Sequence, residues 1–298
     1  MKAALFLAAL ALAACGAPGS SLGTLPSAES TGAARTTNDI LGGAPAAKLS
    51  LKLYDAPITG MPGLKVNIGI EGWQLVTATG KAVPFITNSQ PDVVNLLDLQ
   101  RDAKEYDGGA PIGAYTAARL LVDTKTSNVR IGNMTIPIYW GTPGKVTRAS
   151  VVAIDFPCTF VVTGLLNHAP QISMDFNVLH SVKFANGAIY VQPVVSAAAA
   201  AAQVSGQVVS QAGRPVGNAA VLALDALGHV VNSTATGADG SYAIHALPAG
   251  LYTIQVKNSY VTAAGDTITA TGADAGAMPA TSVILAPNDN LDLAPLVD

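Results

Sequence analysis

Apolar and polar residues alternate along most of this chain with a period of two. Residues 49–53 read Leu-Ser-Leu-Lys-Leu, and residues 66–70 read Val-Asn-Ile-Gly-Ile. Such alternation predicts half-buried β-strands. Further strand-like runs occur at residues 118–122, 129–131, 150–154, 160–162, 172–176, 189–194, 204–209, 219–224, 228–233, 241–244, 251–256, 281–285 and 290–293. Because Gly, Asn, Asp and Pro separate these short runs, the pattern predicts an all-β chain, with one short helical turn around Leu96 and Leu97.

Two changes of composition divide the chain. Residues 15–46 are rich in Gly, Ser, Ala, Thr and Pro and are predicted to form a flexible tether, because they cannot bury enough apolar surface to offset chain entropy. A first β-sandwich is predicted over residues 47–196. The uninterrupted alanine run that follows indicates a linker over residues 197–203, with the last turn of the first domain as the alternative. A second β-sandwich is predicted over residues 204–298.

One short motif occurs once in each predicted domain. Residues 111–116 and residues 248–253 both fit Pro-x-Gly-x-Tyr-Thr. The glycine permits a sharp turn, and the tyrosine two residues later opens a strand. This resembles the tyrosine corner of Greek-key sandwiches, in which the phenol bonds back to the turn backbone. We therefore expect Tyr115 and Tyr252 to have a structural role, with a ligand-binding role as the alternative.

The N-terminus has the pattern of a secretory signal. Lys2 precedes an apolar run over residues 3–12, and two alanines precede Cys15. This stretch resembles the lipobox of bacterial lipoproteins, which implies a signal peptide over residues 1–14 and acylation, with palmitate among the chains, at Cys15; an ordinary cleaved signal is the alternative. Gly16 follows the cysteine. By resemblance to Gram-negative lipoproteins, that favours a lipid anchor in the outer membrane of the cell envelope.

Charge and cysteine content exclude several classes of function. Charged residues make up 12% of the 298 residues and the net charge is -3, so the chain lacks the basic surface that nucleic-acid binding requires. If Cys15 is acylated, Cys158 has no cysteine partner and no disulfide is expected. Cys158 lies in an apolar stretch without a nearby His, so we expect a buried thiol and not a nucleophile.

Common catalytic signatures are absent from the sequence. No G-x-S-x-G elbow, P-loop or zinc-binding His pair occurs. We therefore expect no catalytic residue, metal or cofactor, and the four histidines (His168, His180, His229 and His245) are expected to be solvated. Asp55 and Asp98 are expected to cap turns, with ligand-facing carboxylates as the alternative. Asp175 is expected to face away from a core, and residues 288–292 to form a turn, with a calcium site as the alternative.

Two stretches resemble known families. Residues 204–293 contain, in order, Ser205-Gly206-Gln207-Val208, a Gly213-Arg214-Pro215 turn, an Asp239-Gly240-Ser241-Tyr242 block and the second tyrosine motif. This order resembles the carboxypeptidase regulatory-like, transthyretin-like domain, which implies an accessory β-sandwich without catalytic residues, classed with carbohydrate-binding-like folds. Residues 47–195 resemble the bacterial lipoprotein family called domain of unknown function 4382. The segments that match this family are residues 51–57, 94–99, 111–120 and 189–195.

These observations favour a non-enzymatic, lipid-anchored envelope protein that acts as a binding or scaffold module. Its partners would be the membrane, through the lipid on Cys15, and a glycan or an envelope protein. A carbohydrate-binding module is the first alternative, with Trp73, Tyr139, Trp140 and Tyr190 as candidate ligand-binding residues because aromatic rings stack on sugars. An enzyme of unrecognised type in the first domain is the second alternative. A cleft with clustered Asp and His residues would favour it.

Overall fold

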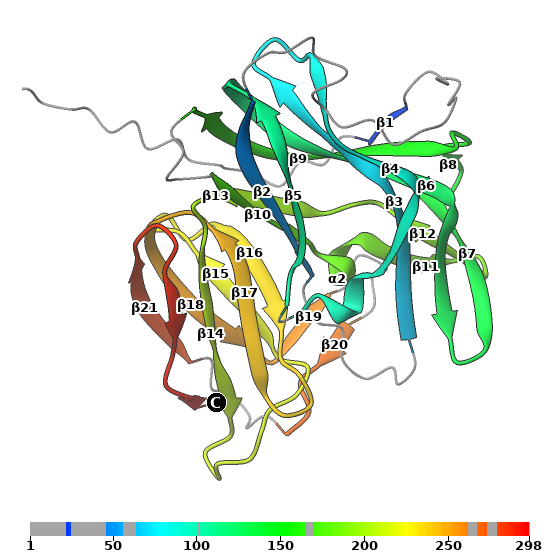
Figure 1. Ribbon diagram of the computed structural model, residues 1–298. Coiled ribbons are helices and arrows are strands. Elements are labelled where there is room, and N and C mark those ends of the chain that lie inside the picture. The colour runs from blue at the N-terminus through cyan, green and yellow to red at the C-terminus, as the bar shows by residue number, and fades with distance from the viewer. Residues whose placement is uncertain are drawn as a thin grey trace, which may run out of the picture.

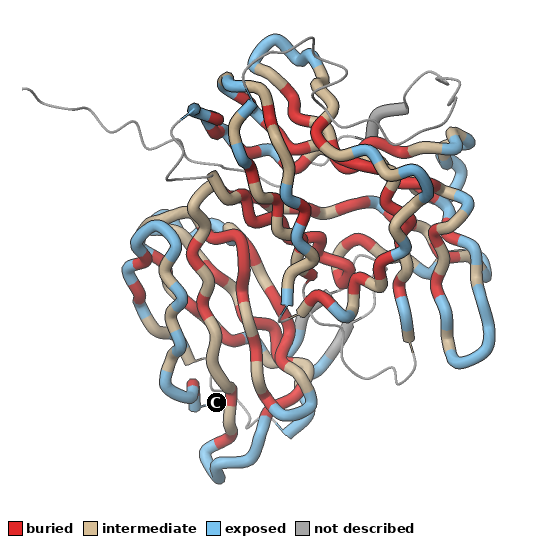
Figure 2. The backbone as a smooth tube through the Cα atoms, in the orientation of Figure 1, coloured by how far each residue is buried: buried red, intermediate tan, exposed pale blue. Residues whose placement is uncertain are grey.

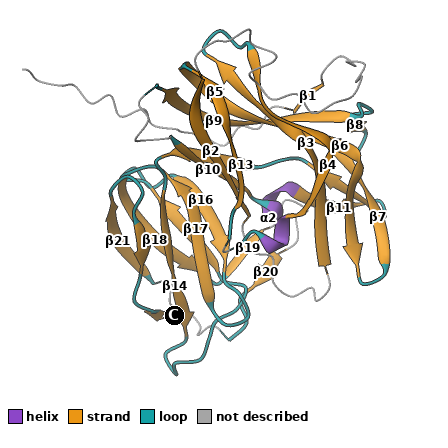
Figure 3. Cartoon of the chain, viewed as in Figure 1, coloured by secondary structure: helices purple, strands orange, loops and turns teal. Residues whose placement is uncertain are grey.

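The computed structural model describes residues 22–24, 46–55, 64–100, 102–164, 170–261, 267–272 and 279–297. Almost all regular structure in these residues is β, as the sequence predicts (Figure 3). The described residues contain two short helical turns, the 3-10 helix η1 (Leu96–Asp98) and α2 (Val178–Ser181). The first confirms the predicted turn around Leu96 and Leu97. No helix in the described part of the chain is long and apolar enough to cross a membrane.

The first domain is a sandwich of a nine-stranded and a four-stranded sheet (Figure 1). The larger sheet contains β1 (Leu22–Thr24), β3 (Leu64–Thr77), β4 (Ala82–Asn95), β6 (Gly113–Ile131), β7 (Met134–Thr142), β8 (Lys145–Val146), β9 (Val151–Val162), β11 (Val182–Ala185) and β12 (Ala188–Val191). The smaller sheet has the order β13 (Val195–Ala199), β10 (Gln171–Phe176), β2 (Ala46–Asp55) and β5 (Lys104–Pro111). Their facing side chains form one core that includes Leu51, Trp73 and Phe156.

The second domain is a smaller sandwich with its own core. One sheet has the order β17 (Ser241–Leu247), β14 (Ala202–Val209) and β22 (Asn290–Asp292), and β23 (Leu296–Val297) also pairs with β14. The other has the order β16 (Val230–Ala235), β15 (Ala220–Leu224), β18 (Gly250–Lys257) and β21 (Ala280–Leu285). β19 (Ser259–Val261) and β20 (Thr267–Thr269) form a separate ribbon. Val204, Val221 and Ile254 lie in the core of this domain.

The alternation read from the sequence matches the burial of the strands. In β2, Leu49, Leu51 and Leu53 are buried and the residues between them are partly exposed. Buried and more exposed positions also alternate along other strands of both domains (Figure 2). Two predicted pairs of strands are single long strands, because 118–122 and 129–131 both lie in β6, and 150–154 and 160–162 both lie in β9. Register shifts within these strands interrupt the period of two along the sequence.

Both predicted tyrosine corners are present. The Tyr115 hydroxyl donates to the Pro111 carbonyl at 2.7 Å, and the Tyr252 hydroxyl donates to the Pro248 carbonyl at 2.8 Å. Both tyrosines are buried. Each phenol therefore fastens the turn that precedes its own strand, which is the structural role expected from the repeated motif.

The alanine run does not form the expected linker. Ala197 pairs with Met174 across β13 and β10, and Ala202 already belongs to β14. Only a turn separates the two strands, in which Ala200 adopts a φ of 49°. The run therefore takes the chain directly from one sandwich into the other. Uniform alanine carries no alternation from which these strands could have been read.

The predicted tether also contains structure. β1, at residues 22–24, pairs antiparallel with β9 and places Gly23 opposite Ala153 at the edge of the larger sheet. The predicted signal peptide, Cys15 and most of the predicted tether lie outside the described residues.

Candidate functional site

The second domain packs on the outer face of the four-stranded sheet of the first. β17 lies against β10 and β13. Asp175 of β10 points away from the first core, as predicted, but it is only 3% exposed because the second domain covers it. The side-chain amide of Asn232 donates to Asp175 Oδ2 at 3.1 Å and to the carbonyl of His245 at 2.9 Å. The amide of Asn177 donates to the Ser233 carbonyl at 3.2 Å. Hydrogen bonds between buried groups therefore fasten the two domains.

His245 lies at the centre of this contact. Its ring stacks on Tyr54 with 4.0 Å between centroids and 11° between planes. Nε2 lies 3.0 Å from the carbonyl oxygen of Gln100, which can only accept, so Nε2 carries a proton. Nδ1 lies 3.0 Å from Oε1 of the Gln203 side chain. Burial lowers the pKa of His245. The prediction of a solvated histidine is wrong at this position, because the sequence does not show which strand face meets the other domain.

A cleft of about 660 Å³ opens beside His245 between the domains. The first domain supplies Leu97, Asp98, Gln100 and Asp102, and the second supplies Gln203, Ser205, Gly206, Gly237, Asp239, Ser241, Tyr242, Ala243, His245 and Asp292. Four of these side chains are exposed carboxylates, and none of the described lining residues is Lys or Arg. The lining offers carboxylate, amide and hydroxyl groups, which suits a ligand that carries several hydroxyl or amine donors.

A smaller cleft of about 160 Å³ lies on the other side of His245 and Gln203. Tyr54, Gln171 and Ser173 line it from the first domain, and Asn288, Asp289 and Asn290 from the second. Within residues 288–292 the Asp289 carboxylate accepts a hydrogen bond from the N–H of Ala286, and Asn288 has a φ of 62°. These contacts fit the predicted turn. Among the described residues, no group of three or more His, Cys, Asp or Glu side chains is arranged to hold a metal ion.

The structure separates the four predicted aromatic residues into two classes. Trp73 is 0% and Trp140 2% exposed, so both indoles lie in the core and neither offers a face to a ligand. Tyr139 is 44% exposed, and its ring centroid lies 5.7 Å from that of the half-buried Tyr190. The two tyrosines are register partners on β7 and β12, and Tyr190 is the register partner of Lys183 on β11. They form an aromatic pair on the outer face of the sheet.

The remaining predicted residues are dispersed. Asp98 lines the interdomain cleft, whereas Asp55 is fully buried and accepts a hydrogen bond from the backbone N–H of Val178 at the start of α2. Asp55 therefore holds the start of a distant helix, and the turn that it is predicted to cap lies outside the described residues. His229 is exposed beside Asp225, as predicted. His180 is half-buried, with Nε2 3.5 Å from the Ser233 hydroxyl, and His168 lies outside the described residues.

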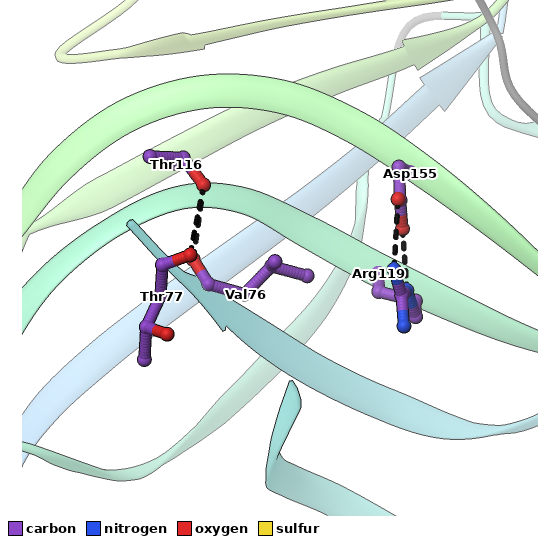
Figure 4. Close-up of polar contacts among 5 residues, drawn as sticks. All are labelled: Val76, Thr77, Thr116, Arg119 and Asp155. Atoms are coloured by element: carbon purple, nitrogen blue, oxygen red, sulfur yellow. Dashed lines mark hydrogen bonds and ion pairs between the residues drawn. The ribbon is translucent and has the colours of Figure 1, made fainter. Parts of the chain in front are cut away.

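Two further polar features have structural roles. The Cys158 side chain is buried in the first core, as the sequence predicts, with its sulfur 4.0 Å from the carbonyl of Thr159. On the outer face of the larger sheet, Arg119 donates two hydrogen bonds to Asp155, at 2.5 and 2.9 Å (Figure 4). These bonds raise the pKa of Arg119. The bidentate pair ties β6 to β9, because the two residues are direct register partners.

Most of the cleft was not predicted from the sequence. Gln100, Asp102, Gln203 and Asp239 share no spacing motif, and they come together only when the two domains dock. The sequence indicates two of the lining carboxylates: Asp98, as a turn cap with a ligand-facing carboxylate as the alternative, and Asp292, in a predicted turn with a calcium site as the alternative. The sequence gives only a weak signal for this cleft: polar residues at the outward positions of strands whose other face is buried.

The second domain is similar to a known family. The family model of the carboxypeptidase regulatory-like domain matches residues 203–281. No curated protein matches the chain. Among solved structures, the Bacillus anthracis TIE protein is 15% identical over 84% of this chain and 34% of its own, with a TM-score of 0.23, so the chain spans about one third of that protein's length.

Two pilins are also among the similar solved structures. BcpA, the major pilin subunit of Bacillus cereus, is 10% identical over 85% of this chain and 99% of its own, with a TM-score of 0.26. The shaft pilin SpaA from Lactobacillus rhamnosus GG is 12% identical over 85% and 97%, with a TM-score of 0.22. Likeness at this level supports no inference about function. The chain thus contains one domain of recognised type, a carboxypeptidase regulatory-like domain at residues 203–281.

Proposed function

We propose that this protein is a non-catalytic, lipid-anchored binding module of the bacterial cell envelope. One observation carries the binding role: the two sandwiches dock through buried hydrogen bonds and leave between them a cleft of about 660 Å³ with a polar, acidic lining. The match of residues 203–281 to a regulatory-like domain supports a structural or binding role. The similarity of residues 47–195 to domain of unknown function 4382 stays a prediction, and it adds no chemistry.

The lipid anchor rests on the signal-like N-terminus and on Cys15. Six residues lie between Cys15 and Leu22 of β1, so seven residue-to-residue steps join the two. A fully extended chain spans about 3.3–3.6 Å per residue, so this segment reaches about 25 Å at most. Acylation at Cys15 would therefore keep the β1–β9 edge of the larger sheet close to the membrane surface. Gly16 favours the outer membrane for this anchor.

Metabolic labelling with an alkyne analogue of palmitate tests the anchor. We expect the full chain to take up the label, Cys15→Ser to lose it, and Cys158→Ala to retain it, because Cys158 is buried in the core. The Cys158 variant is the matched control, since it removes the other thiol of the chain. Label retained in Cys15→Ser would contradict the proposed anchor.

A carbohydrate ligand is the second candidate function, favoured by the exposed pair Tyr139 and Tyr190 and by the hydroxyl, amide and carboxylate groups of the cleft. A glycan array with the full chain in detergent tests it. Loss of binding in the double variant Tyr139→Ala/Tyr190→Ala would place the glycan on the outer sheet face, and loss in Asp98→Asn/Asp102→Asn would place it in the cleft. Thr135→Ala, an exposed change on the same strand as Tyr139, is the control. An array without binding would contradict this candidate.

The cleft also holds clustered Asp side chains and His245, which an enzyme would require. His245 is poorly placed for catalysis, because its ring is stacked and both ring nitrogens already lie at hydrogen-bond distance from Gln100 and Gln203. Incubation of the full chain with a polysaccharide panel, followed by measurement of new reducing ends, separates the two functions. Product release that disappears in Asp98→Asn would overturn the non-catalytic proposal.

A further inference from the structure

Two titratable groups are buried in the contact between the domains. Asp175 is 3% exposed, and one of its carboxylate oxygens accepts from Asn232. The other oxygen, Oδ1, is buried without a hydrogen-bond partner among the described residues. His245, also 3% exposed, lies on the facing strand β17. Each group is solvent-inaccessible only because the other domain covers it, so separation of the domains would hydrate both.

The surroundings of Asp175 favour the uncharged acid. Its register partners are Tyr54 of β2 and Ser196 of β13, and Asn232 of β16 donates to it. His180 of α2 lies 3.5 Å from the hydroxyl of Ser233, the residue after Asn232. No Lys or Arg in the described part of the chain pairs with Asp175. A buried carboxylate with one amide donor and no cation is unfavourable. Burial raises the pKa of Asp175 to about 7, and the bond from Asn232 offsets this only in part.

The surroundings of His245 favour the uncharged imidazole, because burial lowers its pKa. The charged groups on its side of the contact are the four carboxylates of the cleft, all exposed to solvent, and the ion pair Lys52–Glu105 beside Tyr54. With Nε2–H donating to Gln100, a neutral ring needs a donor at Nδ1. Oε1 of Gln203 lies at Nδ1 in the structure, so the neutral ring requires the Gln203 amide in the opposite orientation, with Nε2 of Gln203 donating to Nδ1.

We propose that Asp175 and His245 form an opposed pair of proton switches, because docking of the two domains favours the neutral form of both side chains. When the domains separate in mildly acidic solution, the Asp175 carboxyl releases its proton to water and His245 takes one from water. The two proton steps run in opposite directions, so each offsets the pH dependence that the other gives to docking. At alkaline pH His245 is neutral in both states, and only the ionisation of Asp175 remains to weaken docking.

The effect of pH on docking has the opposite sign for the two groups. Asp175 has a raised pKa when docked, so its contribution is complete below its ordinary value near 3.9 and is lost as pH rises through about 7. His245 has a lowered pKa when docked, so its contribution is complete above its ordinary value of 6.5 and is lost as pH falls below it. Between roughly pH 5 and 8 the two shifts therefore act on the opening equilibrium of the normal chain in opposite directions, and each offsets the other.

Hydrogen–deuterium exchange of the full chain, read on peptides from β10 and β17 and corrected for the intrinsic pH dependence of exchange, measures this opening equilibrium. In Asp175→Asn, a neutral mimic of the acid, opening should increase up to about 30-fold from roughly pH 8 to 5. In His245→Gln it should increase in the opposite direction, by about 80-fold from roughly pH 5 to 8. The double variant should show no pH dependence.

An Asp175→Asn profile identical to that of the unmodified chain would overturn the proposal. Carboxyl carbon NMR of the unmodified chain gives a second test that does not depend on a variant folding: the Asp175 resonance should titrate near neutral pH, and titration in the ordinary aspartate range would refute the mechanism. Asp155→Asn is the matched control, because Asp155 lies on the outer sheet face away from this contact. Neither measurement depends on what the cleft binds.

Discussion

The tyrosine corners give the sharpest test of how this fold is held together. Tyr115→Phe and Tyr252→Phe each delete one hydroxyl and leave the ring in place. In each domain the deleted hydroxyl donates to a proline carbonyl four residues upstream, at 2.7 Å for Pro111 and 2.8 Å for Pro248. Tyr139→Phe is the matched control, because that side chain is 44% exposed and lies on the outer face of the sheet.

The expected loss comes from a carbonyl that no longer receives its donor. Tyr115 is 3% and Tyr252 5% exposed, so little water can replace the hydroxyl. Removing one partner of a buried hydrogen bond costs about 1–3 kcal/mol, and we expect about 1.5 kcal/mol at each corner. A change of this size lowers the melting temperature by about 5 °C for a domain of 150 residues, and by more for the smaller second domain. Tyr139→Phe should change stability by less than about 0.5 kcal/mol.

Urea unfolding followed by two signals separates the domains. Trp73 and Trp140, the only tryptophans of the chain, both lie in the first domain, so tryptophan fluorescence follows that domain. Far-ultraviolet circular dichroism follows both. Tyr115→Phe should shift the fluorescence transition, whereas Tyr252→Phe should shift the dichroism more than the fluorescence. If neither variant differs from Tyr139→Phe, the hydroxyl bonds do not stabilise the corners and the reasoning is wrong.

Three further predictions follow from burial and backbone geometry. In urea unfolding, Trp73→Ala should destabilise the first domain by about 3–5 kcal/mol, because it leaves a cavity at a fully buried site. Tyr139→Ala should cost less than about 1 kcal/mol. Equal losses of stability would contradict the assignment of Trp73 to the core and Tyr139 to the surface. Arg119→Ala should cost about 0.5–1 kcal/mol, since its pair with Asp155 is only partly buried, and high salt should reduce the difference between variant and parent. Ala200→Gly should stabilise the chain by about 0.5–1 kcal/mol in thermal unfolding, because Ala200 has a φ of 49°, a left-handed conformation that is strained for alanine but not for glycine. A loss of stability would show that this backbone strain is absent.

Local patterns determined much of this fold. The alternation of residues 49–53 placed Leu49, Leu51 and Leu53 on a buried face, and the structure confirms it. The repeated motif predicted both hydroxyl bonds of the tyrosine corners. These features were predictable because they depend on residues within a few positions of one another. The side-chain period of a strand and the reach of a phenol to its own turn are both local quantities.

Other features could be decided only in three dimensions. Residue type alone makes Trp73 and Trp140 candidate ligand-binding residues. Both are buried in the structure, and their burial depends on which sheets face each other. Tyr139 and Tyr190 lie 51 positions apart in the chain, and parallel pairing of β7 and β12 brings their rings together. The alanine run is part of two strands because neighbouring strands supply its hydrogen bonds, which a uniform run cannot reveal.

By itself, the sequence determined an all-β chain, the two tyrosine corners, a regulatory-like second domain and a buried Cys158. Only the tertiary structure decided the contact between the domains, the cleft and the opposed environments of Asp175 and His245. The physical reason is that outward-facing polar residues look alike in a sequence whether they meet water or another domain. Their burial, and with it their chemistry, is set by surfaces formed from distant parts of the chain.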